Sequence, residues 1–179
     1  MKHFLPIIFI LASLHLSAQN NGEVSKNLFT VNLLMPSLEW ETRLTYNSTL
    51  DVNLGTGFAV VGGTMYDGTY FGVFPNLMAQ YRHYYNLNRR LEKNKNILNN
   101  SGNYFAFHTG LYGGKPFIGE LESTADYSME LGPVWGLQRV YGEKFKLDLH
   151  LGLGYKFNNL KESALGPIIG FRLGYVLIK

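Results

Sequence analysis

The last fifth of the chain, residues 143–178, alternates apolar residues with polar or small ones. In FKLDLHLGLGYKF every second residue from Phe145 to Phe157 is apolar, and after the polar break NNLKES the alternation returns over residues 165–177. Such alternation predicts a strand with one apolar face and one polar face. Strands of soluble domains usually have about five or six residues, whereas a strand that crosses a bilayer needs about nine to eleven. The length of these runs therefore predicts a transmembrane β-barrel.

Six further segments with the same period precede this pair. The cleanest is SLEWETRL, whose apolar residues are expected to face outward and whose charged residues are expected to face inward. The eight expected strands span Asn27–Met35, 37–44, 49–61, Tyr70–Tyr85, Tyr104–Gly113, Tyr127–Tyr141, 145–157 and 165–177. An even count returns the chain to the side where it began, as a closed single-chain barrel requires. The predicted fold class is all-β, an eight-stranded antiparallel up-and-down transmembrane β-barrel.

Residues 1–19 have the pattern of a secretory signal peptide, which leaves residues 20–179 as a single barrel domain. Lys2 and His3 supply the basic start, an apolar run follows, and small residues around Ala18 offer a cleavage site. The alternative is a retained membrane anchor, but the apolar run is short for a spanning helix.

The composition excludes several classes of function. The chain has no cysteine, which rules out disulfides, thiolate metal sites, a cysteine nucleophile and a lipid anchor on an N-terminal cysteine. The net charge of +3 falls by one when Lys2 leaves with the signal peptide, and it is too weak to predict nucleic-acid binding.

The inward positions on this register collect five acidic and five basic side chains, together with neutral polar residues. The charged ones are Glu39, Glu41, Arg43, Asp51, Arg82, Glu130, Lys146, Asp148, Lys156 and Arg172, and the others are Asn53, Gln80, His108, Gln138 and His150. Buried charges need partners and hydrogen bonds, and an eight-stranded barrel is just wide enough for its own side chains to fill. We therefore expect a paired charge network that fills the lumen and leaves no open pore, with a water-filled channel as the alternative.

The connection Asn86–Asn103 is basic and lacks strand periodicity, and residues 89–97 are expected to form a turn or two of helix. It is either a solvated loop or a contact for anionic headgroups or a periplasmic protein. The acidic connection 114–126 could meet a partner at the cell surface.

Aromatic residues near the predicted strand ends fit girdles at the two membrane interfaces. They are Trp40, Tyr70, Tyr81, Tyr85, Tyr104, Tyr141, Tyr155 and Tyr175.

Three short segments, YRHYY at 81–85, NSGNY at 100–104 and GPVWGL at 132–137, accompany the signal peptide and the long alternating strands. In this combination the chain resembles small outer-membrane β-barrel proteins of Gram-negative bacteria, in particular the outer membrane protein beta-barrel domain group. The resemblance implies a porin-like architecture, an outer-membrane location, lipids as partners and a structural or interaction role. The chain departs from that group in ending on Lys179 rather than on an aromatic residue. The long Asn86–Asn103 connection would also lie on the periplasmic side, where turns are normally short, unless the strand count is wrong by one.

Two other functions remain open at this stage. One is a barrel enzyme that acts on the lipid of lipopolysaccharide, using a histidine with a serine two residues further on. The residues at that spacing after His83, His108 and His150 are Tyr85, Gly110 and Gly152. The other is a soluble lipocalin-like lipid carrier, which would need an apolar lumen and a polar exterior. Lumenal histidines can bind metals or act as bases, but hydrogen bonding is their expected role, so no catalytic, metal or cofactor site is predicted.

Overall fold

A computed structural model of the chain describes residues 22–63, 68–121 and 123–178. The expected signal peptide lies outside these residues. The strands are β1 (Asn27–Asn32), β2 (Ser37–Thr45), β3 (Ser48–Val61), β4 (Tyr70–Tyr84), β5 (Asn103–Gly113), β6 (Ile118–Gly119), β7 (Tyr127–Tyr141), β8 (Phe145–Asn158) and β9 (Ser163–Ile178). The fold is all-β, as predicted, and each of the eight expected strands is present with bounds close to those expected.

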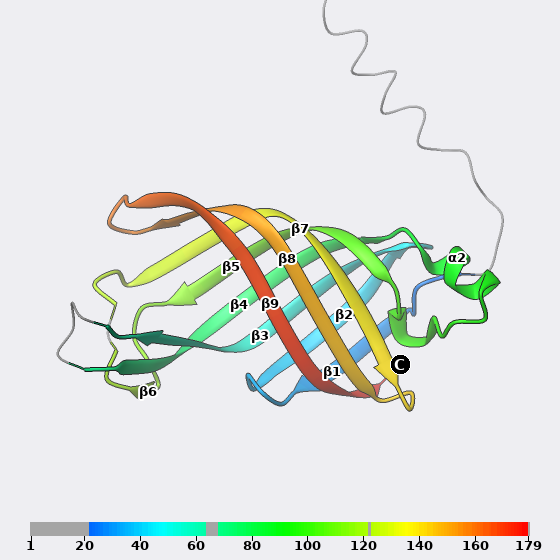
Figure 1. Cartoon of the computed structure of the whole chain (residues 1–179), viewed down its shortest axis with the longest axis horizontal. Coiled ribbons are helices and arrows are strands. Elements are labelled where there is room, and N and C mark those ends of the chain that lie inside the picture. Colours follow the sequence, from blue (N-terminus) through cyan, green and yellow to red (C-terminus); the bar gives the residue numbers. More distant parts are fainter. Residues whose placement is uncertain (1–21, 64–67, 122, 179) are drawn as a thin grey trace, which may run out of the picture.

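Eight of the strands form a closed antiparallel ring. The sheet runs in the order β3-β2-β1-β9-β8-β7-β5-β4-β6, and pairing between β3 and β4 joins its two sides. The short strand β6, which the sequence did not predict, pairs with β4 at Gly72 and Val73. Figure 1 shows the strands crossing the long axis obliquely, with the helical segment at one end and β6 at the other. Every long strand is thus hydrogen-bonded along both edges over part or all of its length.

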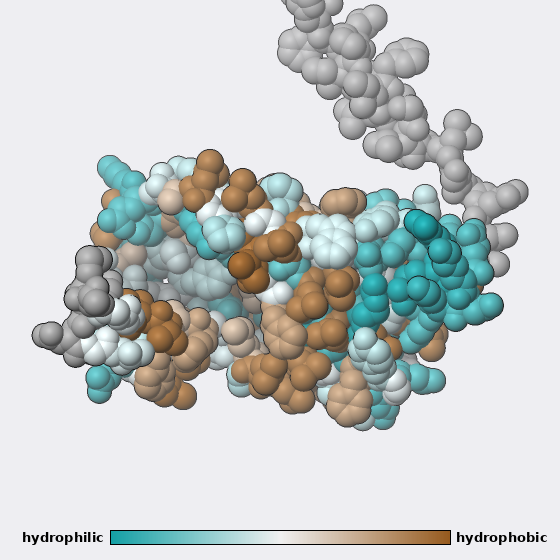
Figure 2. Space-filling model, viewed as in Figure 1, coloured by the Kyte–Doolittle hydropathy of each residue, from teal (hydrophilic) through white to brown (hydrophobic). Residues whose placement is uncertain are grey.

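The side chains of the ring are arranged with polar groups inside and apolar groups outside. Among the buried residues, polar and charged ones outnumber apolar ones by two to one. On the outer face, Leu151, Leu165 and Ile169 are 58%, 73% and 74% exposed. Figure 2 shows brown apolar residues gathered over the middle of the strands and teal residues over the end that carries the helical segment. This arrangement is the reverse of that in a water-soluble protein, which has an apolar interior. It follows from the period of two in the sequence.

The aromatic residues expected at the strand ends differ in their exposure. Trp40, Tyr81, Tyr85, Tyr141 and Tyr155 are exposed on the outside, and Tyr70 and Tyr175 are half-buried. Tyr104 corrects the prediction, because it is fully buried inside the ring. Its position has the same parity along β5 as the inward-facing His108, so the pleat turns its ring inward.

Residues 22–26 and the connection between β4 and β5 cover one end of the ring, which we call the termini end. The connection contains helix α2 (Leu87–Glu92) and the 3-10 helix η1 (Leu98–Asn100). Val24, Leu87 and Tyr84 are buried together there, with Ile97 packed against them. Because four antiparallel strands precede it, this long connection lies at the same end as the N-terminus. Within the described residues, no helix is long and apolar enough to cross a membrane.

Asparagine side chains fix this connection to the neighbouring turn. Asn96 Nδ2 donates to the Val140 carbonyl oxygen at 2.9 Å, and Asn99 Nδ2 donates to the Glu143 carbonyl oxygen at 2.8 Å. Asn99 and Asn100 have φ of 51° and 62°, a left-handed backbone that asparagine tolerates better than most residues. The asparagine-rich sequence therefore forms a defined cover over the termini end.

Candidate functional site

Arg82 on β4 is the centre of a buried charge network. Its side chain is fully buried, and its Nη2 lies 3.0 Å from Asp51 Oδ1 and 3.5 Å from Asp148 Oδ2. Its Nε donates to Gln80 Oε1 at 2.8 Å and its Nη1 donates to Gln138 Oε1 at 3.0 Å. The planar guanidinium thus joins residues of four strands at once, which the three donors of a lysine ammonium could not do in the same geometry.

A second set of contacts surrounds two glutamates of β2. Lys146 Nζ donates to Glu39 Oε1 and lies 3.6 Å from Glu41 Oε2. Arg172 Nη1 lies 3.6 Å from Glu39 Oε2 and 3.0 Å from Asp51 Oδ1, and its Nη2 lies 3.1 Å from Asp148 Oδ1. These cations link β8 and β9 to β2 and β3 across the inside of the ring.

The central network holds four carboxylates and three protein cations. The carboxylates are Glu39, Glu41, Asp51 and Asp148, and the cations are Arg82, Lys146 and Arg172. Neutral donors supplement the cations. Glu41 accepts hydrogen bonds from Thr49 at 2.7 Å and from Tyr84 at 2.8 Å, while Asp148 accepts one from Tyr104 at 2.9 Å. Sequence reasoning missed both tyrosine donors, although their inward parity could have identified them.

Three of these carboxylates are close enough to be considered as metal ligands. Oxygens of Glu39, Glu41 and Asp51 lie within 4.8 Å of one another. However, Lys146 contacts both glutamates, and Arg82 and Arg172 both contact Asp51. The cations of the protein occupy the place that a metal would take, so we assign no metal to this cluster.

The remaining predicted network residues lie apart from this centre. Glu130 contacts Lys156 Nζ at 3.1 Å, accepts a hydrogen bond from Tyr112 and lies 3.3 Å from His108 Nε2. Arg43 is a correction, because it is half-exposed at the termini end and pairs with Glu23 at 2.8 Å. Of the expected five acids and five bases, all five acids but only three bases are buried inside the ring, because Lys156 is also partly exposed.

The inward histidines are engaged in hydrogen bonds. His150 Nδ1 lies 3.2 Å from Asp148 Oδ1, and His108 Nδ1 lies 3.0 Å from Gln80 Nε2. Their rings are 5.7 Å apart. The two imidazoles, one beside the other, thus connect the central network, through Asp148 and Gln80, with the Glu130 cluster, through His108.

A serine–histidine pair occurs elsewhere, on the strands β3 and β4. His83 Nδ1 lies 3.1 Å from Ser48 Oγ, and Asn47 Nδ2 lies 3.4 Å from His83 Nε2. Ser48 is only 2% exposed, so its hydroxyl is not presented to a substrate. A second possible combination, Ser128 with Glu130 and His108, brings together only the last two. Neither arrangement has the geometry of an accessible nucleophile with its base.

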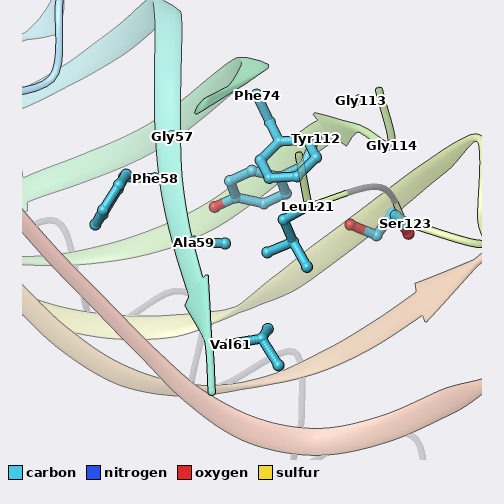
Figure 3. Close-up of a pocket in the computed structure, with 11 residues that line it drawn as sticks. Gly57, Phe58, Ala59, Val61, Phe74, Tyr112, Gly113, Gly114, Leu121 and Ser123 are labelled. Carbon is cyan, nitrogen blue, oxygen red and sulfur yellow. The ribbon is translucent and has the colours of Figure 1, made fainter. Parts of the chain in front are cut away.

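An apolar pocket of about 430 Å³ opens at the end of the ring opposite the termini end, and we call it the mouth pocket. Figure 3 shows Ala59 and Val61 on the side of β3 that faces Tyr112, Phe74 and Leu121. The described residues that line it are Gly57, Phe58, Ala59, Val61, Phe74, Tyr112, Gly113, Gly114, Leu121, Ser123 and Ser128. The sequence contains a signal for this pocket, because the inward residues change along β3 from acidic and amide types to glycine and alanine.

A polar cavity of similar size lies next to the mouth pocket. It is also about 430 Å³, and Tyr112 and Ser128 line both spaces. Glu130 and Lys156 supply the charged groups of this second cavity. The half of the ring away from the termini end therefore contains open space with an apolar part and a charged part, whereas the other half is filled.

In comparisons with known proteins, no family model, curated protein or solved structure matches this chain.

Proposed function

We propose that this chain is an outer-membrane β-barrel protein with a structural or interaction role, whose lumen is filled by paired charged side chains and forms no open pore. The observation that carries this proposal is the reversed polarity of a closed strand ring. Where its strands are paired on both sides, the ring satisfies its own backbone hydrogen bonds, as hydrocarbon requires of any spanning structure. Apolar side chains in the middle of its outer face would meet lipid tails, and the exposed tyrosines and tryptophans would lie at the interfaces.

The same polarity disfavours a soluble lipid carrier. A lipocalin-like barrel has an apolar interior and a polar exterior. Here the middle of the interior holds Glu39, Arg82 and Asp148, each at most 1% exposed, while leucines and isoleucines cover the outside. A water-soluble fold of this kind would expose a far larger apolar area than monomeric proteins tolerate.

We orient the barrel with its termini end toward the periplasm, as the resemblance to outer-membrane barrels implies. The cover formed by residues 22–26 and 85–102 then lies on that side, with Arg89, Lys93 and Lys95 near its surface. A charged cover fixed by asparagine hydrogen bonds suits contact with a periplasmic protein or with anionic headgroups. Outer-membrane lipids are the partners of the strands, and the connections are where a protein partner would bind.

Heat-modifiability of the membrane fraction tests the proposal. Without boiling, the folded barrel should migrate differently on a denaturing gel from the boiled chain, and it should leave the membrane only with detergent. A protein that stays in solution without detergent and shows no shift would overturn the membrane assignment.

We further expect no steady ion conductance from the purified protein in planar bilayers. Arg82, Gln138 and Lys146 are at most 1% exposed and fill the cross-section with their partners. Long-lived channel openings of uniform size, absent from protein-free bilayers, would contradict a filled lumen.

A further inference from the structure

The mouth pocket and the polar cavity beside it have complementary chemistry. Among the residues that the structure describes, the mouth pocket is lined by small and apolar residues and by the rings of Phe74 and Tyr112, with no charged side chain. Its volume of about 430 Å³ lies in the range of small-molecule sites, about 300–1,000 Å³, and far exceeds the roughly 150 Å³ apolar cavity that binds benzene. Filling an apolar space of this size with a hydrocarbon chain is more favourable in free energy than filling it with water.

The polar cavity supplies one accessible positive charge. The Lys156 side chain is 45% exposed, whereas that of Glu130 is 10% exposed. Glu130 is also held by Tyr112 and lies near His108, so it keeps partners when Lys156 turns toward a ligand. The charge open to an incoming group is therefore the ammonium, which favours an anion.

The wall of the ring is thin beside the mouth pocket. Pairing between β4 and β5 ends at Asn76 and Tyr112, and the next residue pair would be Pro75 and Gly113. Proline has no N–H to donate, and glycine has no side chain. Gly113 lines both the mouth pocket and an apolar groove of about 560 Å³ on the outer face, which Leu54, Leu77 and Leu111 also line. This position brings the pocket close to the lipid that would surround the barrel.

We propose that the mouth pocket binds the hydrocarbon chain of a single-chain anionic amphiphile of the fatty-acid class, taken from the surrounding bilayer, while Lys156 holds its acidic head. This inference rests on the proposed placement of the barrel in the outer membrane. It assigns a ligand site to the half of the ring that the charge network does not fill.

A photoreactive palmitic acid bearing a diazirine on its chain tests the site. The protein is placed in phosphatidylcholine nanodiscs, irradiated with the probe and mapped by mass spectrometry. We expect adducts on Ala59, Phe74 and Leu121, in addition to adducts on the outer groove. Adducts confined to outer residues such as Leu54 and Leu77 would overturn the proposal, because they report lipid contact alone.

A matched pair of variants on β3 separates pocket binding from surface labelling. Ala59→Phe fills the pocket from inside, whereas Val60→Phe adds the same ring at the adjacent outward position, which is 52% exposed. Ala59→Phe should lower pocket adducts about tenfold or more relative to groove adducts, and Val60→Phe should leave the ratio unchanged. An unchanged ratio in Ala59→Phe would overturn the site.

The head group is tested with Lys156→Gln. Capture of the acid probe should fall about tenfold, the usual effect of losing a charge-assisted hydrogen bond, while capture of the corresponding diazirine alcohol should not change. An equal effect on both probes would overturn the role of Lys156.

The boiling shift is measured on the same preparations. A heat-modifiable protein without pocket adducts contradicts only the ligand site, and a soluble protein with pocket adducts contradicts only the membrane placement.

Discussion

Arg82→Ala should destabilise the folded protein by about 3–5 kcal/mol, the usual cost of removing one partner from a buried ion pair. Its guanidinium contacts Asp51 and Asp148, and without it the four central carboxylates would face only Lys146 and Arg172. The free energy of unfolding is measured by urea titration of the protein folded into lipid vesicles, with tryptophan fluorescence as the signal. A loss below about 1 kcal/mol would mean that water reaches this position and solvates the freed carboxylates.

Two further variants show whether charge or geometry carries this effect. Arg82→Lys keeps the charge but cannot bond Gln80, Gln138 and Asp51 together, so its cost should lie between that of Arg82→Ala and zero. Arg43→Ala is the matched exposed control. Its pair with Glu23 is open to solvent, and its loss should cost less than about 1 kcal/mol. Equal losses for Arg43→Ala and Arg82→Ala would contradict a dry, filled interior.

The strands and the inward set were predictable because a single physical rule governs both. In a strand, side chains alternate between two faces, so the position of one residue fixes the face of all the others. From SLEWETRL alone, Glu39 and Glu41 had to point to the side opposite Trp40, and the structure buries both glutamates. The tight turn at Gly142 was predictable for a similar reason. Its φ of 55°, followed by 64° at Glu143, places two consecutive left-handed residues between β7 and β8, a backbone that glycine adopts without strain.

Other features depend on position along the ring axis, which parity does not specify. Arg43 has inward parity, but it lies at the rim, where Glu23 and solvent compete for it. Tyr104 was expected at a membrane interface, and its inward parity places it against Asp148 instead. The mouth pocket depends on how residues 114–121 fold back against β4, through β6 and the bond from Leu121 N to the Phe71 carbonyl oxygen. Such non-local pairing leaves no periodic trace in the sequence.

Leu151→Arg should destabilise the protein by about 2–4 kcal/mol in lipid vesicles. Leu151 lies in the middle of β8, is 58% exposed and stands between Trp135 on β7 and Ile169 on β9. If that face meets the centre of a bilayer, the arginine places a charge in hydrocarbon or thins the membrane around it, and either outcome costs free energy. The free energy of unfolding is measured by urea titration under the conditions used for Arg82→Ala.

Leu160→Arg is the control for depth. Leu160 has a similar exposure of 48%, but it lies in the connection between β8 and β9, beyond the strand ends. The same substitution there should cost about 0–1 kcal/mol, because the charge would remain in the interfacial or aqueous region. Small and equal effects at both sites would mean that the outer face of the ring meets water, where exposed substitutions usually change stability by about 0.5 kcal/mol or less. In water, the loss in free energy of unfolding would not depend on how far the arginine lies from the strand ends. The difference between the two variants therefore tests the membrane placement directly.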